Sequence, residues 1–191
     1  MELISRICLK LFGWKIEGKK PDLKKVVIIA APHTSNWDLP ITLFISFVLR
    51  MPIFWMGKNS IFKRPFERLF KWLGGIPIDR TCSNSVVKQS INQFETRDEL
   101  LLAIPPSGTR AKVTYWKTGF YHIAMGAKVP IALGFLDYKR KRGGFGPLVH
   151  PTGNIDADME IIQNFYKNIT GKHPEKSTTL AKIKKSSDYK S

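Results

Sequence analysis

The stretch that decides the fold is an apolar run followed by a polar motif: Val26-Val27-Ile28-Ile29-Ala30-Ala31-Pro32-His33-Thr34-Ser35-Asn36-Trp37-Asp38. The first six residues are apolar and mostly β-branched, and they end at Pro32, which predicts a short buried strand. The stretch from Leu39 to Arg50 predicts a helix. His33 therefore lies where a strand leads into a helix. At such positions α/β proteins expose polar groups at the edge of the sheet.

The spacing of His33 and Asp38 limits how the two side chains can meet. Five residues on a continuous helix correspond to about 140° of rotation, so the side chains would diverge. They meet if the chain turns between them, with Asp38 in the first helical turn. The carboxylate then holds one ring nitrogen and leaves the other free to act as a base. An alternative is a helix capping box formed by Ser35 and Asp38, which requires no catalysis.

Composition and charge indicate a globular protein that binds anions. The chain has 191 residues, 43% of them hydrophobic, which suits one domain with a real core. Its formal net charge of +16 favours nucleic acid, anionic lipid, phosphorylated substrates or acidic carrier proteins as partners. The two cysteines, Cys8 and Cys82, predict neither a disulfide framework nor a metal site. A reducing compartment is the simpler expectation, and we predict a cytoplasmic location.

Predicted strands and helices alternate along the chain. Strands are expected at 26–31, 52–57, 76–80, 100–104, 129–138 and 148–149, and helices at 39–50, 62–73, 83–96, 117–127 and 155–170. This order predicts an α/β fold, a single domain with a central, mostly parallel sheet flanked by helices. We divide the chain into an N-terminal amphipathic helix (1–16), the domain itself (17–171) and a mobile, basic polar tail (172–191).

The N-terminal segment has two possible roles. Apolar residues recur at helical spacing from Leu3 to Trp14, with Arg6, Lys10 and Lys15 between them. Such a helix either lies in a membrane interface or packs on the protein core. The apolar region 41–56 is interrupted by charge and proline and is too short to span a bilayer. We therefore predict a peripheral protein at an anionic membrane surface.

Two further loops carry groups suited to phosphate. Arg80 follows the Gly74-Gly75 pair and a short extended segment. Residues 107–110 combine two hydroxyls, a glycine and a guanidinium, which can bind phosphate through two parallel hydrogen bonds. Loops at the carboxyl ends of parallel strands converge on one crevice, so these loops are expected near His33.

Four sequence blocks together resemble the 1-acylglycerol-3-phosphate acyltransferase family, the lysophosphatidate acyltransferase-like group. Residues 33–38 match its His-x4-Asp block, and 74–80 resemble Gly-x-Ile-x-x-x-Arg, with Gly74 as the glycine and Arg80 as the arginine. Residues 106–110 resemble Pro-Glu-Gly-Thr-Arg, and 129–131 resemble the closing Val-Pro-Ile block. The resemblance spans about residues 26–135, in the family's order.

The resemblance implies a glycerolipid acyltransferase-like fold and activity. A fatty acyl group would pass from acyl-CoA or acyl carrier protein, as co-substrate, to a hydroxyl of a lysophospholipid, with 1-acylglycerol-3-phosphate as the expected acceptor in phospholipid biosynthesis. No cofactor and no metal are implied. His33, oriented by Asp38, would be the base. The predicted substrate-binding residues are Gly74, Arg80, Ser107, Gly108, Thr109 and Arg110.

Three alternatives remain at this point. Ser107 stands where the family pattern has Glu, so the acceptor is expected to be lysophosphatidate or a different lipid. The charge alone would also suit a nucleic-acid-binding module, but no binding motif is present and His33 would be unexplained, so no nucleic acid is expected. A phosphate-ester hydrolase with metal at Asp38 would need clustered carboxylates, which the sequence lacks there.

Overall fold

The computed structural model describes residues 1–79, 83–177 and 182–183. Its helices are α1 (Glu2–Leu11), α2 (Asp38–Leu49), α3 (Glu67–Trp72), α4 (Ser83–Thr96), α5 (Gly119–Ala127) and α6 (Ile155–Tyr166), with short 3-10 turns at Asn59–Ile61 and Pro174–Lys176. Its strands are β1 (Lys15–Glu17), β2 (Lys25–Ala31), β3 (Ile53–Lys58), β4 (Gly75–Ile78), β5 (Leu100–Ile104), β6 (Tyr115–Trp116), β7 (Ile131–Asp137), β8 (Arg142–Val149) and β9 (Lys182–Ile183).

Within these residues, seven strands form one central sheet in the order β1-β8-β7-β2-β5-β3-β4. Strand β2 is parallel to both of its neighbours, β5 and β7, and β3 is parallel to β5 and β4. Strands β7 and β8 pair antiparallel as a hairpin. The predicted α/β fold with a mostly parallel sheet flanked by helices is confirmed. Strands β2, β3, β4, β5 and β7 all end at the same edge of the sheet.

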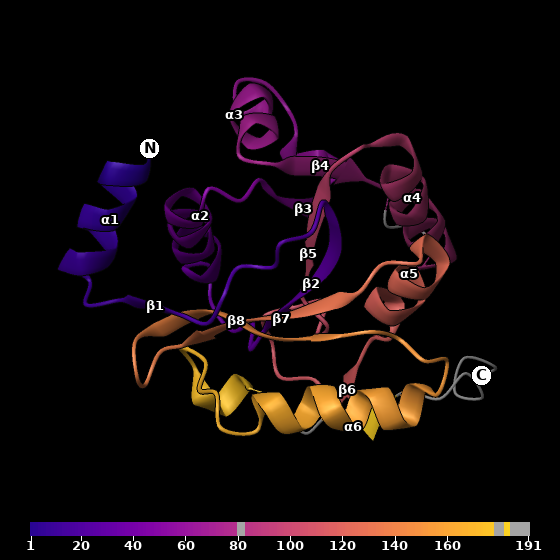
Figure 1. Ribbon diagram of the computed structural model, residues 1–191. Coiled ribbons are helices and arrows are strands. Elements are labelled where there is room, and N and C mark those ends of the chain that lie inside the picture. Colours follow the sequence, from indigo (N-terminus) through magenta and orange to yellow (C-terminus); the bar gives the residue numbers. More distant parts are fainter. Residues whose placement is uncertain (80–82, 178–181, 184–191) are drawn as a thin grey trace.

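Helices cover both faces of this sheet (Figure 1). The alternating side chains of β2 show the two layers, because Val27 and Ile29 face one core cluster while Val26 and Ile28 face another. The first cluster is completed by residues of α4, α5 and α6. The second face is covered by α2, and α1 packs on the outside of α2. Strand β2 is therefore buried on both faces, as its unbroken apolar run predicts.

Helix α1 has one side against α2 and another exposed. Ser5 and Leu9 are buried, whereas Leu3, Ile7 and Leu11 are exposed. Both roles considered for this segment thus have a structural basis, since one side packs on the core and the other presents apolar side chains. No helix in the described part of the chain is long and apolar enough to cross a membrane.

Local structure differs from the sequence prediction in three places. Residues 15–17 form an edge strand, β1, parallel to β8, instead of the end of the N-terminal helix. The helix expected at 62–73 is limited to Glu67–Trp72, because a proline at 65 disfavours helical backbone at the residue before it. Strand β8 runs from Arg142 to Val149, whereas the strand expected there covers only 148–149. Short polar or glycine-rich strands such as these lack the apolar pattern by which strands are predicted.

Candidate active site

The candidate catalytic pair lies at the carboxyl end of β2. His33 follows the last residue of this strand by two positions, and Asp38 is the first residue of α2. The chain turns between them as the spacing requires. The His33 side chain is 20% exposed and the Asp38 side chain 8%, so the imidazole is accessible while the carboxylate is shielded from water.

Four hydrogen-bond donors surround the Asp38 carboxylate. Oδ2 lies 3.0 Å from Nδ1 of His33 and accepts the backbone N–H groups of Thr34 and Ser35, each at 3.0 Å. Oδ1 accepts the hydroxyl of Tyr138 at 2.7 Å. Three of the donors come from the motif itself, and the fourth comes from the end of β7. The carboxylate is thus fixed from two sides, and it fixes the histidine ring in turn.

These contacts determine where the proton of the pair resides. Burial would raise the pKa of Asp38, but hydrogen bonds from His33, Tyr138 and the Ser35 N–H outweigh it and hold that pKa below its usual value. An ionised carboxylate only accepts hydrogen bonds, so Nδ1 of His33 carries the hydrogen. In the neutral ring, Nε2 then has the free lone pair and lies on the side away from Asp38. This is the arrangement of a general base.

Part of the helix-capping alternative is also present. Asp38 accepts the N–H of Ser35, as the acidic residue of a capping box does, but the hydroxyl of Ser35 accepts the N–H of Trp37 at 3.2 Å instead of that of Asp38. The same carboxylate therefore begins the helix and orients the histidine. The two interpretations of this motif are compatible.

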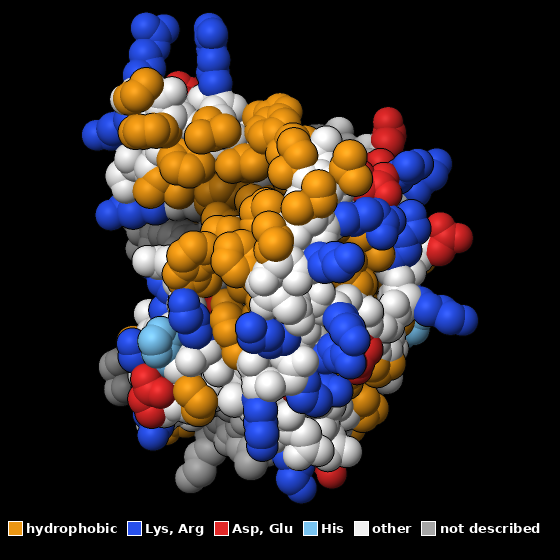
Figure 2. All heavy atoms as spheres, turned by 90° about the vertical axis from the view of Figure 1, so that its left-hand side faces the viewer, with side chains coloured by type: hydrophobic (Ala, Val, Ile, Leu, Met, Phe, Trp, Pro, Cys, Tyr) orange, Lys and Arg blue, Asp and Glu red, His pale blue; other side chains and the backbone are white. Residues whose placement is uncertain are grey.

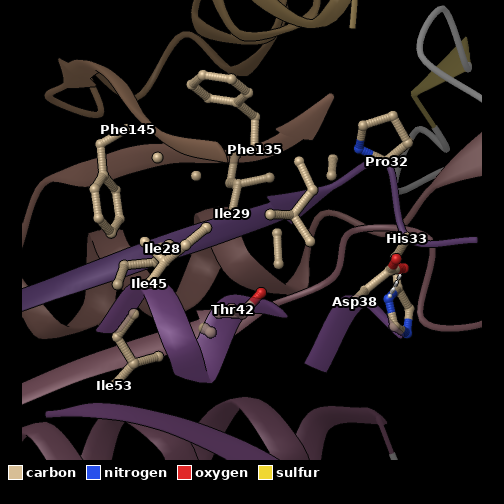
Figure 3. Close-up of a pocket in the computed structure, with 16 residues that line it drawn as sticks. Ile28, Ile29, Pro32, His33, Asp38, Thr42, Ile45, Ile53, Phe135 and Phe145 are labelled. Carbon is tan, nitrogen blue, oxygen red and sulfur yellow. Dashed lines mark hydrogen bonds and ion pairs between the residues drawn. The ribbon is translucent and has the colours of Figure 1, made fainter. Parts of the chain in front are cut away.

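An apolar cavity of about 50 Å³ extends from the catalytic pair beneath the sheet. Figure 3 shows His33 and Asp38 at one end, Thr42 of α2 along it, and Ile53 and Phe145 at the far end. The cavity separates α2 from the face of the sheet formed by β2, β7 and β8. A narrow apolar slot that begins beside His33 suits the carbons next to the reactive end of a hydrocarbon chain.

The predicted phosphate-binding loop, residues 107–110, follows β5 and lies near His33. Ser107 and His33 line the same small crevice. The Ser107 hydroxyl donates to the Thr109 carbonyl at 2.6 Å, and Gly108 adopts a φ of +66° that favours glycine. Arg110 is exposed beyond this turn. The loop is thus held by its own contacts, and the exposed guanidinium of Arg110 lies at its end.

The first residues of the predicted tail complete this crevice. Lys176 and Ser177 line it together with His33 and Ser107. The backbone N–H of His173 donates to the Thr34 hydroxyl at 3.2 Å, which holds the segment against the catalytic motif. The described residues 172–177 therefore lie beside the site, while residues 178–181 and 184–191 of the predicted tail lie outside the described residues.

Among the described substrate-binding candidates, Gly74 is not brought to the pair. Gly74 precedes β4 and so lies at the amino-terminal edge of the parallel strands, opposite to His33. Its φ is +81°, and a Cβ there would lie 2.3 Å from the carbonyl oxygen of Ile53, so the tight turn after α3 explains this glycine. Arg80 lies outside the described residues, although β4, which precedes it, ends at the catalytic edge.

Three residues near the site were missed by sequence reasoning. Tyr138 holds Asp38, and Lys176 lines the crevice beside His33. The side chain of Lys117 lies over Gly108, with its amine 3.3 Å from where a Cβ would stand. The available signal for Tyr138 was its place at the end of a predicted strand. For the two lysines the sequence offered only their charge, which 31 Lys and Arg residues share.

Comparisons of the sequence with known proteins indicate one family. The sequence profile of the Acyltransferase family matches residues 14–132. The 1-acyl-sn-glycerol-3-phosphate acyltransferase of Escherichia coli (strain K12) is 33% identical over 131 residues, which are 63% of this chain and 52% of that protein. The Haemophilus influenzae enzyme of the same name is 30% identical over 131 residues, 63% of this chain and 53% of that protein. The chain spans about half the length of these curated relatives.

A solved structure shares the fold. The crystal structure of the 1-acyl-sn-glycerophosphate (LPA) acyltransferase PlsC from Thermotoga maritima superposes with a TM-score of 0.63 at 16% identity, covering 87% of this chain and 76% of that one. The fold and the His–Asp pair thus define an α/β protein with a hydrogen-bonded histidine at the edge of its sheet. By its sequence match, the chain belongs to the Acyltransferase family.

The donors around Asp38 also bear on the metal-dependent alternative. Both carboxylate oxygens face hydrogen-bond donors, an arrangement that stabilises negative charge without a cation. In the described part of the chain, no group of three or more His, Cys, Asp or Glu side chains is placed to hold a metal ion. The donors at Asp38 therefore fit a carboxylate that orients the histidine ring.

Proposed function

We propose that this chain transfers a fatty acyl group from a thioester to a hydroxyl of a lysophospholipid, with 1-acylglycerol-3-phosphate as the acceptor that its relatives' names favour. The observation that carries the proposal is the 3.0 Å contact between Nδ1 of His33 and Oδ2 of Asp38. It leaves Nε2 as a base at the mouth of an apolar slot. The donor is expected to be acyl-CoA or an acyl carrier protein, and the +16 net charge suits either anion.

The geometry supports a direct transfer. Nε2 of His33 takes the proton from the acceptor hydroxyl as its oxygen attacks the thioester carbonyl carbon. The C–S bond then breaks, and the imidazolium returns the proton to the departing thiolate. The Asp38 carboxylate stabilises the imidazolium between these two proton transfers. The thiolate is already a good leaving group, so no acyl-enzyme is required. The carbons of the donor's acyl chain next to the thioester would lie in the slot shown in Figure 3.

The acceptor phosphate is expected at the loop after β5. Arg110 is exposed there, and the amine of Lys117 lies over Gly108, so two cations are close to one turn. A guanidinium binds phosphate through two parallel hydrogen bonds, and a lysine adds charge without that geometry. Arg80 remains a predicted third cation. Holding the phosphate places the acceptor hydroxyl, and positioning of this kind supplies much of the rate of such reactions.

A different lipid acceptor is the second candidate, and Ser107 favours it. This residue lines the crevice beside His33, where the family pattern has a carboxylate. Ser107→Glu would place a negative charge beside His33 and Lys176. If Ser107 sets acceptor choice, this variant should change the ratio of kcat/KM between lysophosphatidate and lysophosphatidylglycerol. An unchanged ratio would remove the argument for a different acceptor.

We also infer peripheral attachment to an anionic membrane. Figure 2 shows apolar side chains gathered on one face and bordered by lysines and arginines. The exposed apolar residues of α1, α3 and the site are Leu3, Ile4, Ile7, Leu11, Phe12, Trp37, Phe66, Leu69 and Trp72. An apolar surface with a basic border is the pattern of proteins that lie in the lipid interface. The cytoplasmic side remains a prediction from the cysteine content.

Transfer can be tested directly with the full chain. The purified protein would be mixed with lysophosphatidate in anionic liposomes and with palmitoyl-CoA or the palmitoyl thioester of acyl carrier protein, and products would be identified by mass spectrometry. We expect phosphatidate to form and to be absent with His33→Ala. A panel of lysophospholipids would rank the acceptors. If no lysophospholipid is acylated with either donor, the proposed function is wrong.

A further inference from the structure

A second cavity, of about 300 Å³, lies between α1, α2 and the end of β7. Its walls are aromatic and aliphatic, with two lysines among them: Phe12, Trp14, Trp37, Pro40, Ile41, Phe44, Tyr138, Lys141 and Lys172. Among the described residues that line it, none is acidic. An apolar space with cations at its mouth suits a molecule with a hydrocarbon chain and a negatively charged head.

Helix α2 divides this cavity from the slot that reaches His33. Asp38, Thr42 and Ile45 lie at positions i, i+4 and i+7 and line the slot. Trp37, Pro40, Ile41 and Phe44 lie at i, i+3, i+4 and i+7 and line the second cavity. Each set forms one stripe of a helix with 3.6 residues per turn. Helix α2 therefore lies between two apolar spaces, and each space is lined by a different face of the helix.

The second cavity is close to the catalytic pair. Tyr138 forms part of its wall, and the Tyr138 hydroxyl lies 2.7 Å from Oδ1 of Asp38. The other oxygen of Asp38 contacts His33 at 3.0 Å. Two consecutive hydrogen bonds, between Tyr138 and Asp38 and between Asp38 and His33, therefore connect the wall of the second cavity to the imidazole. A hydrocarbon chain bound in this cavity would lie on one side of α2, and a hydrocarbon chain bound in the slot would lie on the other side.

The mouth of the cavity belongs to the apolar face of the molecule. Phe12 and Trp37 line it, and these residues are 55% and 53% exposed. The amine of Lys172 lies 5.2 Å from the centroid of the Trp37 ring, and the amine of Lys141 donates to the carbonyl of Phe12 at 2.9 Å. Both cations are therefore held at the opening, where a lipid would enter from a membrane.

We propose that this cavity binds the hydrocarbon chain that an anionic lysophospholipid acceptor already carries, with Lys141 and Lys172 at the opening through which the anionic lipid enters. The inference rests on the proposed function and deepens it. Transfer to a lysophospholipid brings two hydrocarbon chains to one base, and the structure offers two apolar spaces that flank that base. The slot lined by His33 takes the reactive end of the arriving chain, and the cavity lined by Tyr138 holds the resident chain.

Binding can be measured without catalysis, because Trp14 and Trp37 line the cavity. The probe is lysophosphatidate with a dibrominated chain, used below its critical micelle concentration and without liposomes, since bromine quenches tryptophan fluorescence on contact. We expect saturable quenching that is lost in the double variant Trp14→Phe/Trp37→Phe and kept in Trp55→Phe, whose ring packs against Phe62 and Phe70. Lys172→Gln should raise the Kd by about fivefold, because it removes one partly exposed charge contact.

Chain-length dependence separates the two cavities. Ile41→Phe reduces the volume of the second cavity and should raise the KM for lysophosphatidate with long chains more than with short ones, while leaving the preference for donor length unchanged. Ile161→Phe, an exposed position on α6, is the matched control. Circular dichroism would confirm that both variants fold.

The outcomes are distinguishable from failure of the proposed function. If the wild-type protein acylates lysophosphatidate but Trp14 and Trp37 are not quenched, the assignment of the cavity is wrong while the function stands. The assignment is also wrong if Ile41→Phe changes the preference for the donor chain instead. If the fluorescence of Trp14 and Trp37 is quenched but no lysophospholipid is acylated, the second cavity binds lipid but does not hold an acceptor, and the proposal is wrong.

Discussion

The hydroxyl of Tyr138 donates a 2.7 Å hydrogen bond to Oδ1 of Asp38, and this bond joins two residues that are 100 positions apart in the sequence. It exists because β7, which ends at Asp137, pairs with β2, which leads to His33. Burial, followed by the hydrogen bond to Asp38, raises the pKa of Tyr138 far above its usual value, so it remains a neutral donor. Tyr138 and Asp38 therefore orient His33 through two consecutive hydrogen bonds.

Tyr138→Phe should lower kcat without unfolding the protein. It removes a hydrogen bond to a charged group, which is worth about 1.5–3 kcal/mol, so we expect at least a tenfold fall in kcat with a smaller change in KM. The pKa of Asp38, followed by NMR of its carboxyl carbon, should rise. Tyr121→Phe is the matched control, because Tyr121 donates a 2.7 Å bond to Asp158 away from the site. A loss of stability in both variants with normal kcat would show that Tyr138 is only structural.

Asp38 should make stability depend on acid pH. The pKa of Asp38 in the folded protein is lowered, whereas that of an aspartate in the unfolded chain is about 3.9. At pH values between these two pKa values, the unfolded chain binds more protons than the folded protein. The stabilisation is complete above the unfolded pKa and is lost as the pH falls through the folded pKa. We expect the difference in unfolding free energy between wild type and Asp38→Asn, measured in urea, to shrink below about pH 4. A difference that is constant down to pH 2 would contradict this assignment.

The central part of the fold was predictable because its pattern is strong. The run from Val26 to Ala31 is apolar and β-branched on both faces, and the structure has it as β2 between two parallel neighbours. The edge strands were less predictable. Strand β8 contains Gly143, Gly144 and Pro147, and its pairing with β7 comes from the hairpin and not from an apolar pattern. Such strands are determined by tertiary contacts that the sequence does not display.

The site was predictable only as far as local spacing extends. His33 and Asp38 are close in sequence, so their contact could be inferred from the turn that must join them. Residues 107–110 were placed near them by the rule that parallel strands end at one edge. Tyr138 required knowledge of the strand order. Lys176 required the path of the chain after α6, which carries no motif.

The apolar side of α1 should contribute to membrane binding. Ile7→Ser and Leu11→Ser change exposed residues of this helix and should weaken sedimentation with anionic liposomes, because each change removes apolar area from the interface. Ile161→Ser is the control, since its side chain is 56% exposed on α6, which lies far from α1 in Figure 1. High salt should weaken the remaining binding by screening the basic border. Equal binding of all three variants at every salt concentration would refute this role of α1.

Arg110 is expected to act on the acceptor. Arg110→Lys keeps the charge but loses the planar fork that binds two phosphate oxygens, so the KM for lysophosphatidate should rise several-fold with little change in kcat. Arg97→Lys is a suitable control, because Arg97 precedes β5 at the opposite edge of the sheet and its guanidinium lies over Phe54. Steady-state kinetics with each substrate varied would decide the assignment. If only the KM for the thioester rises, Arg110 acts in binding the donor instead of the acceptor.

The base itself gives the most direct prediction. His33→Ala should lower kcat by about 10²–10⁴-fold, the usual contribution of a general base, while circular dichroism and liposome binding stay unchanged. Asp38→Asn should also be severe, because an amide no longer stabilises the imidazolium.

The order of bond changes can be tested in the same assay. Rapid acid quenching followed by mass spectrometry of the intact protein should find no acylated form, since the acceptor oxygen attacks the thioester directly. Ser35 and Ser107 are the hydroxyls to inspect, because both lie in the loops that form the site. An acyl group on either serine that passes to lysophosphatidate at the rate of turnover would replace this mechanism with a covalent one. Normal turnover by His33→Ala would remove the histidine from the chemistry altogether.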